Sequence, residues 1–190
     1  MSNNKNAKLN DRKSDGELLL KRFIAFIGDW YLASVLAGLP ILLMYGMTTG
    51  DDKVVTALTS LPFNQAMIAG TMAIMISSAY YVLIPTYVYK GQTLGKKFLG
   101  VKVATLDKSE ITIKTMFKRE ILGVLLVEGG LVAGSGYLRQ MLGLAISPTI
   151  YTVLGGVSII VTVVSIVMVY KTIGRRMIHD YIAGTIIIKA

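Results

Sequence analysis

The chain has 190 residues, of which 53% are hydrophobic and 16% are charged, and its formal net charge at pH 7 is +9. Soluble domains carry about 25% charged residues, so this composition indicates a membrane protein and argues against the soluble nucleic-acid-binding domain that the charge alone would suggest. The absence of cysteine excludes disulfides, thiolate metal sites and a catalytic thiol.

The N-terminal part of the chain changes from polar to apolar near residue 18. Residues 1–17 are polar and of mixed charge, so we expect a flexible cytoplasmic tail ahead of a single membrane domain over residues 18–190. The apolar run that follows is too long for the core of a cleaved signal peptide. Since about 20 mostly apolar residues cross a bilayer as a helix, residues 19–45 and 66–89 are predicted as the first two spans.

A basic, water-facing segment covers residues 90–120. Apolar and polar residues alternate on both sides of the sequence LDKS at residues 106–109, which predicts a β-hairpin. The C-terminal sequence TIIIK at residues 185–189 is a further strand candidate, and we expect it to pair with residues 99–105. The glycines and lysines of residues 91–100 lack the spacing of a phosphate-binding loop, so no nucleotide site is expected there.

The third predicted span, residues 121–138, is short and rich in glycine. Residues 139–148 form either a connection or a short re-entrant piece, and residues 149–170 are predicted as the last span. Gly130 and Gly134 have the GxxxG spacing that allows close helix contact, either in a dimer or within the bundle.

The distribution of basic residues predicts the orientation. Of the 20 Lys and Arg residues, all except Lys53 and Arg139 precede or begin the first span, lie in residues 90–120, or follow the last span. Four spans with both termini in the cytoplasm satisfy the positive-inside rule, whereas three spans with a re-entrant third segment would spoil the asymmetry. The predicted fold is therefore an all-α integral membrane protein with four transmembrane helices and a small cytoplasmic β-hairpin or sheet.

Ionisable residues inside the predicted spans mark the candidate site. Such a residue costs about 2.5–3.5 kcal/mol near the bilayer centre. Arg22 and Asp29 share a helix face about 10 Å apart, so Arg22 either extends toward Asp29 or anchors at the headgroups. Asp29 either takes part in function or is satisfied by a neighbouring helix for structural reasons, and Glu128 could face the same cavity.

The single histidine, His179, precedes Asp180. A histidine beside a carboxylate is either a pH-sensitive group or a hydrogen-bonded structural residue. The sequence has no second histidine and no clustered ligand set, so no metal site is expected.

Four blocks of this sequence resemble the RDD family of small bacterial membrane proteins, which is named for one arginine and two aspartates. Arg22 and Asp29 in RFIAFIGDWYL match the first block, and Asp180 in the C-terminal block matches the second aspartate. The remaining matches are GQTLGKKFLGVKV at residues 91–103, KRE with Arg119 and Glu120, and RRMIHDYIAGTIII at residues 175–188. The resemblance implies a multi-pass protein of the bacterial inner membrane, and cation/proton exchange has been proposed within the family.

The leading hypothesis for function is a small secondary transporter that exchanges a monovalent cation for protons. Asp29 is the expected exchange site and Arg22 its tuning charge, with Asp180 and Glu128 completing the ion path. The residues expected to support them are Arg119, Glu120, His179, Gln92 and Thr93. A non-transporting scaffold for a cytoplasmic partner and an exporter of a small organic solute are the alternatives.

The expected partners are the lipid bilayer, monovalent cations, protons and a second copy of the chain, and no nucleic acid is expected. The sequence contains no nucleophile and base pair and no cofactor motif, so neither enzymatic activity nor a cofactor is expected.

Overall fold

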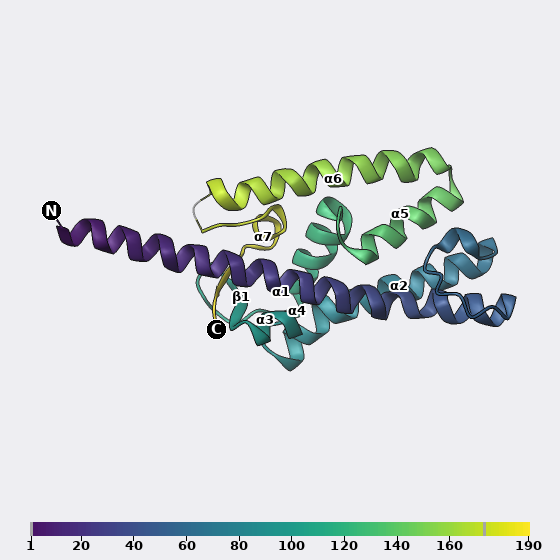
Figure 1. Ribbon diagram of the computed structural model, residues 1–190, viewed down its shortest axis with the longest axis horizontal. Helices are drawn as coiled ribbons and strands as arrows, with labels where there is room; N and C mark the ends of the chain where they lie inside the picture. The colour runs from purple at the N-terminus through teal and green to yellow at the C-terminus, as the bar shows by residue number, and fades with distance from the viewer. Residues whose placement is uncertain (1, 173) are drawn as a thin grey trace.

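The computed structural model describes residues 2–172 and 174–190, with side chains from residue 16 onward. The chain is mainly helical and carries one two-stranded sheet (Figure 1). Two of its helical segments, η2 and η3, are π-helical, and η1 is a short 3₁₀ helix. The elements in chain order are α1 (Ser2–Thr49), η1 (Leu58–Ser60), α2 (Phe63–Leu83), η2 (Ile84–Val88), α3 (Leu94–Phe98), β1 (Val101–Thr105), α4 (Ile113–Phe117), η3 (Lys118–Glu128), α5 (Ala133–Ala145), α6 (Pro148–Lys171), α7 (Ile178–Ala183) and β2 (Thr185–Lys189).

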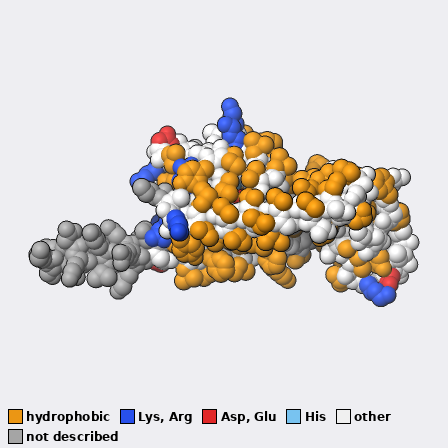
Figure 2. Space-filling model, turned by 90° about the horizontal axis from the view of Figure 1, so that it is seen from above, with side chains coloured by type: hydrophobic (Ala, Val, Ile, Leu, Met, Phe, Trp, Pro, Cys, Tyr) orange, Lys and Arg blue, Asp and Glu red, His pale blue; other side chains and the backbone are white. Residues whose placement is uncertain are grey.

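Three helices are long and apolar enough to cross a membrane. They comprise Gly16–Thr49 of α1, Phe63–Val88 of α2 and η2, and Pro148–Lys171 of α6, and they match three of the predicted spans. Figure 2 shows that hydrophobic side chains cover most of the visible face, while Lys and Arg lie mainly toward the end near the N-terminus. The chain is therefore a membrane protein, as its composition predicted.

Residues 121–138, predicted as the third span, do not form one straight helix in the structure. The chain forms two helices there, Ile113–Glu128 and Ala133–Ala145, which are bent by 51° relative to each other. Gly129 adopts a positive φ of 39° and ends the first helix, because glycine has no Cβ to oppose that conformation. The structure thus has three candidate spans, or up to four if the bent pair counts as one.

The glycines of this third segment pack inside the chain. A Cβ atom on Gly130 would lie 2.7 Å from the hydroxyl oxygen of Thr162 in α6, and one on Gly134 would lie 3.1 Å from Ser77 in α2. Small residues permit these close helix approaches. The geometry favours packing within the bundle over a dimer face for the GxxxG pair.

Residues 2–17, predicted as a flexible tail, continue α1 as a helix in the structure. Lengthening an existing helix needs no new nucleus, so residues 2–17 can continue α1. The flexibility of this segment stays a prediction.

The small sheet joins the basic segment to the C-terminus. β1 and β2 are antiparallel, with Val101 opposite Lys189 and Thr105 opposite Thr185. The predicted pairing of the C-terminal strand with residues 99–105 is confirmed. The hairpin about residues 106–109 is wrong, because the chain after it forms α4, whose N-terminus is capped by Thr112.

The sheet is held against the membrane helices by a shared hydrophobic cluster. Val101, Val103 and Ile187 from the two strands pack with Ala25 of α1 and Val82 of α2. A second hydrophobic cluster joins α1 to α2 farther along the bundle. Together these two clusters hold α1 close to the segment that contains α3.

Helix α3 packs with its backbone directly on α1. A Cβ atom on Gly95 would lie 2.6 Å from the carbonyl oxygen of Ala25 and 3.0 Å from the carboxylate carbon of Asp29. A side chain at residue 95 therefore has no room unless the two helices separate.

We expect Gly95→Ala to lower the free energy of unfolding by about 2 kcal/mol, since it overpacks the contact between α3 and α1. Gly28→Ala is the matched control, because nothing lies within 4 Å of its added Cβ atom and residue 28 is exposed within α1. Thermal unfolding in detergent measures both variants. Equal melting temperatures for the two variants would contradict the tight packing at Gly95.

Candidate functional site

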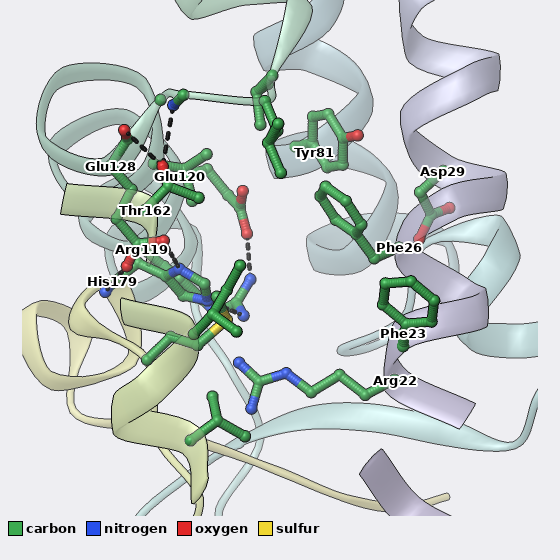
Figure 3. Close-up of a pocket in the computed structure, with 18 of the residues that line it drawn as sticks. Arg22, Phe23, Phe26, Asp29, Tyr81, Arg119, Glu120, Glu128, Thr162 and His179 are labelled. Atoms are coloured by element: carbon green, nitrogen blue, oxygen red, sulfur yellow. Dashed lines mark hydrogen bonds and ion pairs between the residues drawn. The ribbon is translucent and has the colours of Figure 1, made fainter. Parts of the chain in front are cut away.

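A cavity of about 280 Å³ lies between α1, η3, α6 and α7 (Figure 3). It brings together ionisable side chains from distant parts of the sequence. These are Arg22, Asp29, Lys96, Arg119, Glu120, Glu128 and His179.

Asp29 lies at one side of this cavity and is only 2% exposed. The Tyr80 hydroxyl donates a hydrogen bond to it at 2.5 Å, the Gly95 N–H donates one at 2.8 Å, and the Thr93 hydroxyl donates a third. All three donors are neutral, so they stabilise the ionised carboxylate without cancelling its charge. The residue thereby joins α1 to α2 and α3.

Arg22 does not pair with Asp29 in the structure. Its guanidinium donates to the Asp180 carboxylate at 2.6 Å and to the Arg175 carbonyl at 2.8 Å. Within the described residues no ion pair joins Arg22 to Asp29. The separation along α1 explains this, because Asp29 is satisfied by α2 and α3 while Arg22 lies beside the C-terminal segment.

Asp180 is fully buried between two arginines. One carboxylate oxygen binds Arg22, and the other accepts two hydrogen bonds from Arg119, each at 3.2 Å. The N–H of Met177 donates to it as well, at 3.1 Å. Burial raises the pKa of Asp180, but Arg22, Arg119 and the Met177 N–H outweigh burial and hold the pKa below its ordinary value.

His179 connects Arg119 to Glu128. Its Nδ1 lies 2.9 Å from one Glu128 oxygen, and its Nε2 lies 2.7 Å from an Arg119 nitrogen. Arginine can only donate, so Nε2 must accept and the ring proton must be on Nδ1. The ring is therefore bound in its neutral form, and a proton added at Nε2 would confront the guanidinium.

Glu128 and Glu120 complete the charged lining. Glu128 is 4% exposed and accepts from the backbone N–H of His179 at 2.7 Å and from the Ser165 hydroxyl at 2.8 Å. Glu120 accepts a hydrogen bond from the Arg119 guanidinium. Glu128 and Asp29 line one cavity, but their hydrogen-bond partners are different.

The other expected supporting residues have separate positions. Thr93 binds Asp29 directly. Gln92 donates from its amide to the Val101 carbonyl at 2.9 Å, so it holds the turn before α3 against β1. Gln92 is therefore outside the cavity lining.

Two residues of the cavity were not recognised in the sequence as site residues. Lys96 lines the cavity, and within the described part of the chain no hydrogen bond or ion pair holds its ammonium group. Burial, with Arg119 nearby, lowers the pKa of Lys96. Its neighbour Lys97 is exposed instead and lies over the Tyr89 ring at 3.7 Å. Only the orientation of α3 distinguishes the two lysines.

The other unrecognised residue is Tyr81. Its hydroxyl oxygen is buried and has no hydrogen-bond partner among the described residues, and the side chain lines the cavity. In the sequence Tyr81 looks like the interfacial tyrosines that anchor membrane helices.

Comparison with known proteins identifies the family of this chain. The sequence model of the RDD family matches residues 18–184, so the chain belongs to the RDD family. An uncharacterized protein, YckC of Bacillus subtilis (strain 168), is 24% identical over 159 residues, which cover 84% of this chain and 78% of that protein. The comparison with solved structures found no significant match.

We expect Asp180→Asn to destabilise the fold by about 3–5 kcal/mol, because it leaves two buried arginines without their shared carboxylate. Glu110→Gln is the control, since its ion pair with Lys90 is exposed and contributes about 0–1 kcal/mol. Thermal unfolding in detergent compares the two. A loss at Asp180 no larger than that at Glu110 would show that the two arginines do not depend on this carboxylate.

Proposed function

We propose that this RDD-family chain is a secondary transporter that exchanges a monovalent cation for protons in the bacterial inner membrane. The observation that supports this most is the environment of Asp29, a buried carboxylate at the cavity wall whose three hydrogen-bond donors are all neutral.

An uncompensated charge in a poorly solvated cavity is costly, so the site favours one added positive charge. A cation and a proton each supply that charge, and binding of one disfavours binding of the other. This exclusion is the physical basis of exchange.

Asp29 is the proposed position for the transported cation. Its three neutral donors leave a full negative charge at the cavity wall. Arg22 and Arg119 are already bound to Asp180 and are less able to neutralise it.

His179 is a second place at which the added proton could act. Protonation at Nε2 would oppose the Arg119 guanidinium and weaken their 2.7 Å contact. Because Arg119 also binds Asp180 and Glu120, this change would reach the whole cluster. The proton would thus alter the packing of α7 against η3.

The proposed topology has four crossings with both termini in the cytoplasm. Both chain ends lie at the same end of the long helices in Figure 1, which supports an even number of crossings. Four helices are few for alternating access, so we expect two copies to work together with a shared pathway.

A non-transporting scaffold is the second candidate. The observation that favours it is the bonding of Asp180, which attaches α7 to α1 and η3 with both arginines satisfied. In a scaffold this cluster would serve only to hold the C-terminal strand and the basic segment as a docking surface. Measured exchange in vesicles separates the two candidates.

For Asp29→Asn in proteoliposomes we expect at least a tenfold loss of cation-driven proton release, because the amide removes the negative charge from the cavity wall. Asp52→Asn, which changes an exposed loop residue, keeps the wild-type rate. Thermal unfolding establishes that Asp29→Asn remains folded. Wild-type exchange by the folded variant would remove Asp29 from the mechanism.

For Lys96→Gln we expect a several-fold increase in the apparent affinity for the transported cation, since a competing positive charge leaves the cavity. The increase is largest below the lowered pKa of Lys96, where the wild-type ammonium is charged, and it disappears as pH rises through that pKa. Lys97→Gln is the matched control on the same short helix. Concentration dependence of exchange measured across pH tests this, and equal behaviour of the two variants would refute the role of Lys96.

A further inference from the structure

The walls of the cavity are mainly apolar. Its volume of about 280 Å³ is several times the roughly 30 Å³ that one water occupies in the liquid. Hard cations need several oxygen ligands, and most of the wall supplies carbon. The apolar side chains of the wall include Phe23, Phe26, Leu131, Val132, Ile166 and Val169.

The two aromatic residues on α1 point to a different kind of cation. Phe23 and Phe26 lie between the α1 ribbon and the charged cluster in Figure 3. Aromatic faces attract organic ammonium groups, and more strongly when water is excluded. A cation with an apolar tail thus matches both the charge and the walls.

The rim of the cavity is apolar and is exposed on the outside of the helices. Phe23, Leu131 and Tyr170 line the cavity, yet they are 60%, 52% and 73% exposed. Helix α6 packs on α5 and η3 rather than on α1, as Figure 1 also shows. An opening between α1 and α6 therefore faces the hydrocarbon of the membrane.

At the polar end of the cavity, a tyrosine hydroxyl without a hydrogen-bond partner lies near two carboxylates. The Tyr81 hydroxyl has no partner within the described chain and lies in the field of Glu120 and Asp29. A buried polar group without a hydrogen-bond partner is unfavourable, because it has lost its contact with water and gained none in the protein. An ammonium N–H would satisfy the hydroxyl, and the carboxylates would match its charge.

We propose that the exchanged cation is an amphipathic organic ammonium that enters this cavity sideways from the membrane, between α1 and α6. This inference rests on the proposed function, because it names the class of cation that is exchanged. The ammonium binds near Tyr81, Glu120 and Asp29, and its tail lies along Phe23 and Ile166. Lys96 already places an ammonium in the same cavity, so an arriving one competes with it and promotes release of a proton.

Photolabelling of the full chain in liposomes tests the site. The probe is an eight-carbon primary alkylamine with a diazirine on its tail, and mass spectrometry locates the label. We expect the probe to label residues 166–170. Excess octylamine lowers this labelling at least fivefold, whereas methylamine at the same concentration does not lower it. Residues 159 and 160 are exposed on α6 outside the cavity, so octylamine does not lower the labelling of these two residues.

Tyr81→Phe is the decisive variant, because the hydroxyl has no partner in the described structure and its removal breaks no hydrogen bond there. We expect it to reduce the competed label at residues 166–170 several-fold. Tyr87→Phe, an exposed tyrosine of the same span, leaves the label unchanged. Equal labelling by the two variants would overturn the proposed polar contact.

A carboxylic-acid probe of the same length is the charge control. Equal competed labelling by this probe would make the cavity a site for anionic lipids and overturn the proposal. Equal competition by methylamine would make it a small-cation site and would also overturn it. If octylamine competes with the amine label but no proton-coupled flux is measured, the binding site stands and the proposed transport function is refuted. If the protein exchanges sodium or potassium but octylamine does not compete with the label, only the inference about the organic cation is refuted.

Discussion

The burial of Asp180 between two arginines is the constraint on which the arrangement of this chain depends. Three ionised groups with little exposure to water are tolerable only because each has a partner at hydrogen-bond distance. The carboxylate meets Arg22 from the first helix and Arg119 from η3, so it determines where three distant segments lie. The small sheet repeats that linkage, since β2 directly follows α7 and pairs with β1.

The charged residues divide into two groups with different chemical roles. Around Asp180, both carboxylate oxygens and the guanidinium groups of Arg22 and Arg119 have hydrogen-bond partners, so this group of residues holds the segments together. Around Asp29 the partners are neutral, Lys96 is unbonded in the described structure and Tyr81 has an unused hydroxyl. The residues around Asp29 are therefore the ones suited to binding, because an added ion or molecule can improve only interactions that are still unsatisfied.

Sequence patterns predicted the features that have a strong local signature. Long apolar runs gave the three uninterrupted spans, and the pairing of the C-terminal strand was correct. The break at Gly129 was missed because hydropathy does not detect a single left-handed residue inside an apolar run. The hairpin was mispredicted because the alternation after residue 109 is short, and residues 113–117 form α4 instead of a second strand.

The charged residues of the site were predicted more completely than their pairing. The family resemblance identified Arg22, Asp29, Arg119 and Asp180, all of which lie in or beside the cavity. Spacing along α1 suggested that Arg22 acts on Asp29, but a one-dimensional pattern contains no information on a carboxylate that is 158 residues away. Lys96 and Tyr81 were missed because their roles depend on which way a helix face turns after folding.

The separation of 158 residues between Arg22 and Asp180 has a consequence for biogenesis. A chain is synthesised from its N-terminal side, so Arg22 is made long before the carboxylate that pairs with it. The first helix can therefore reach its final contacts only after α7 has been synthesised and has packed against η3.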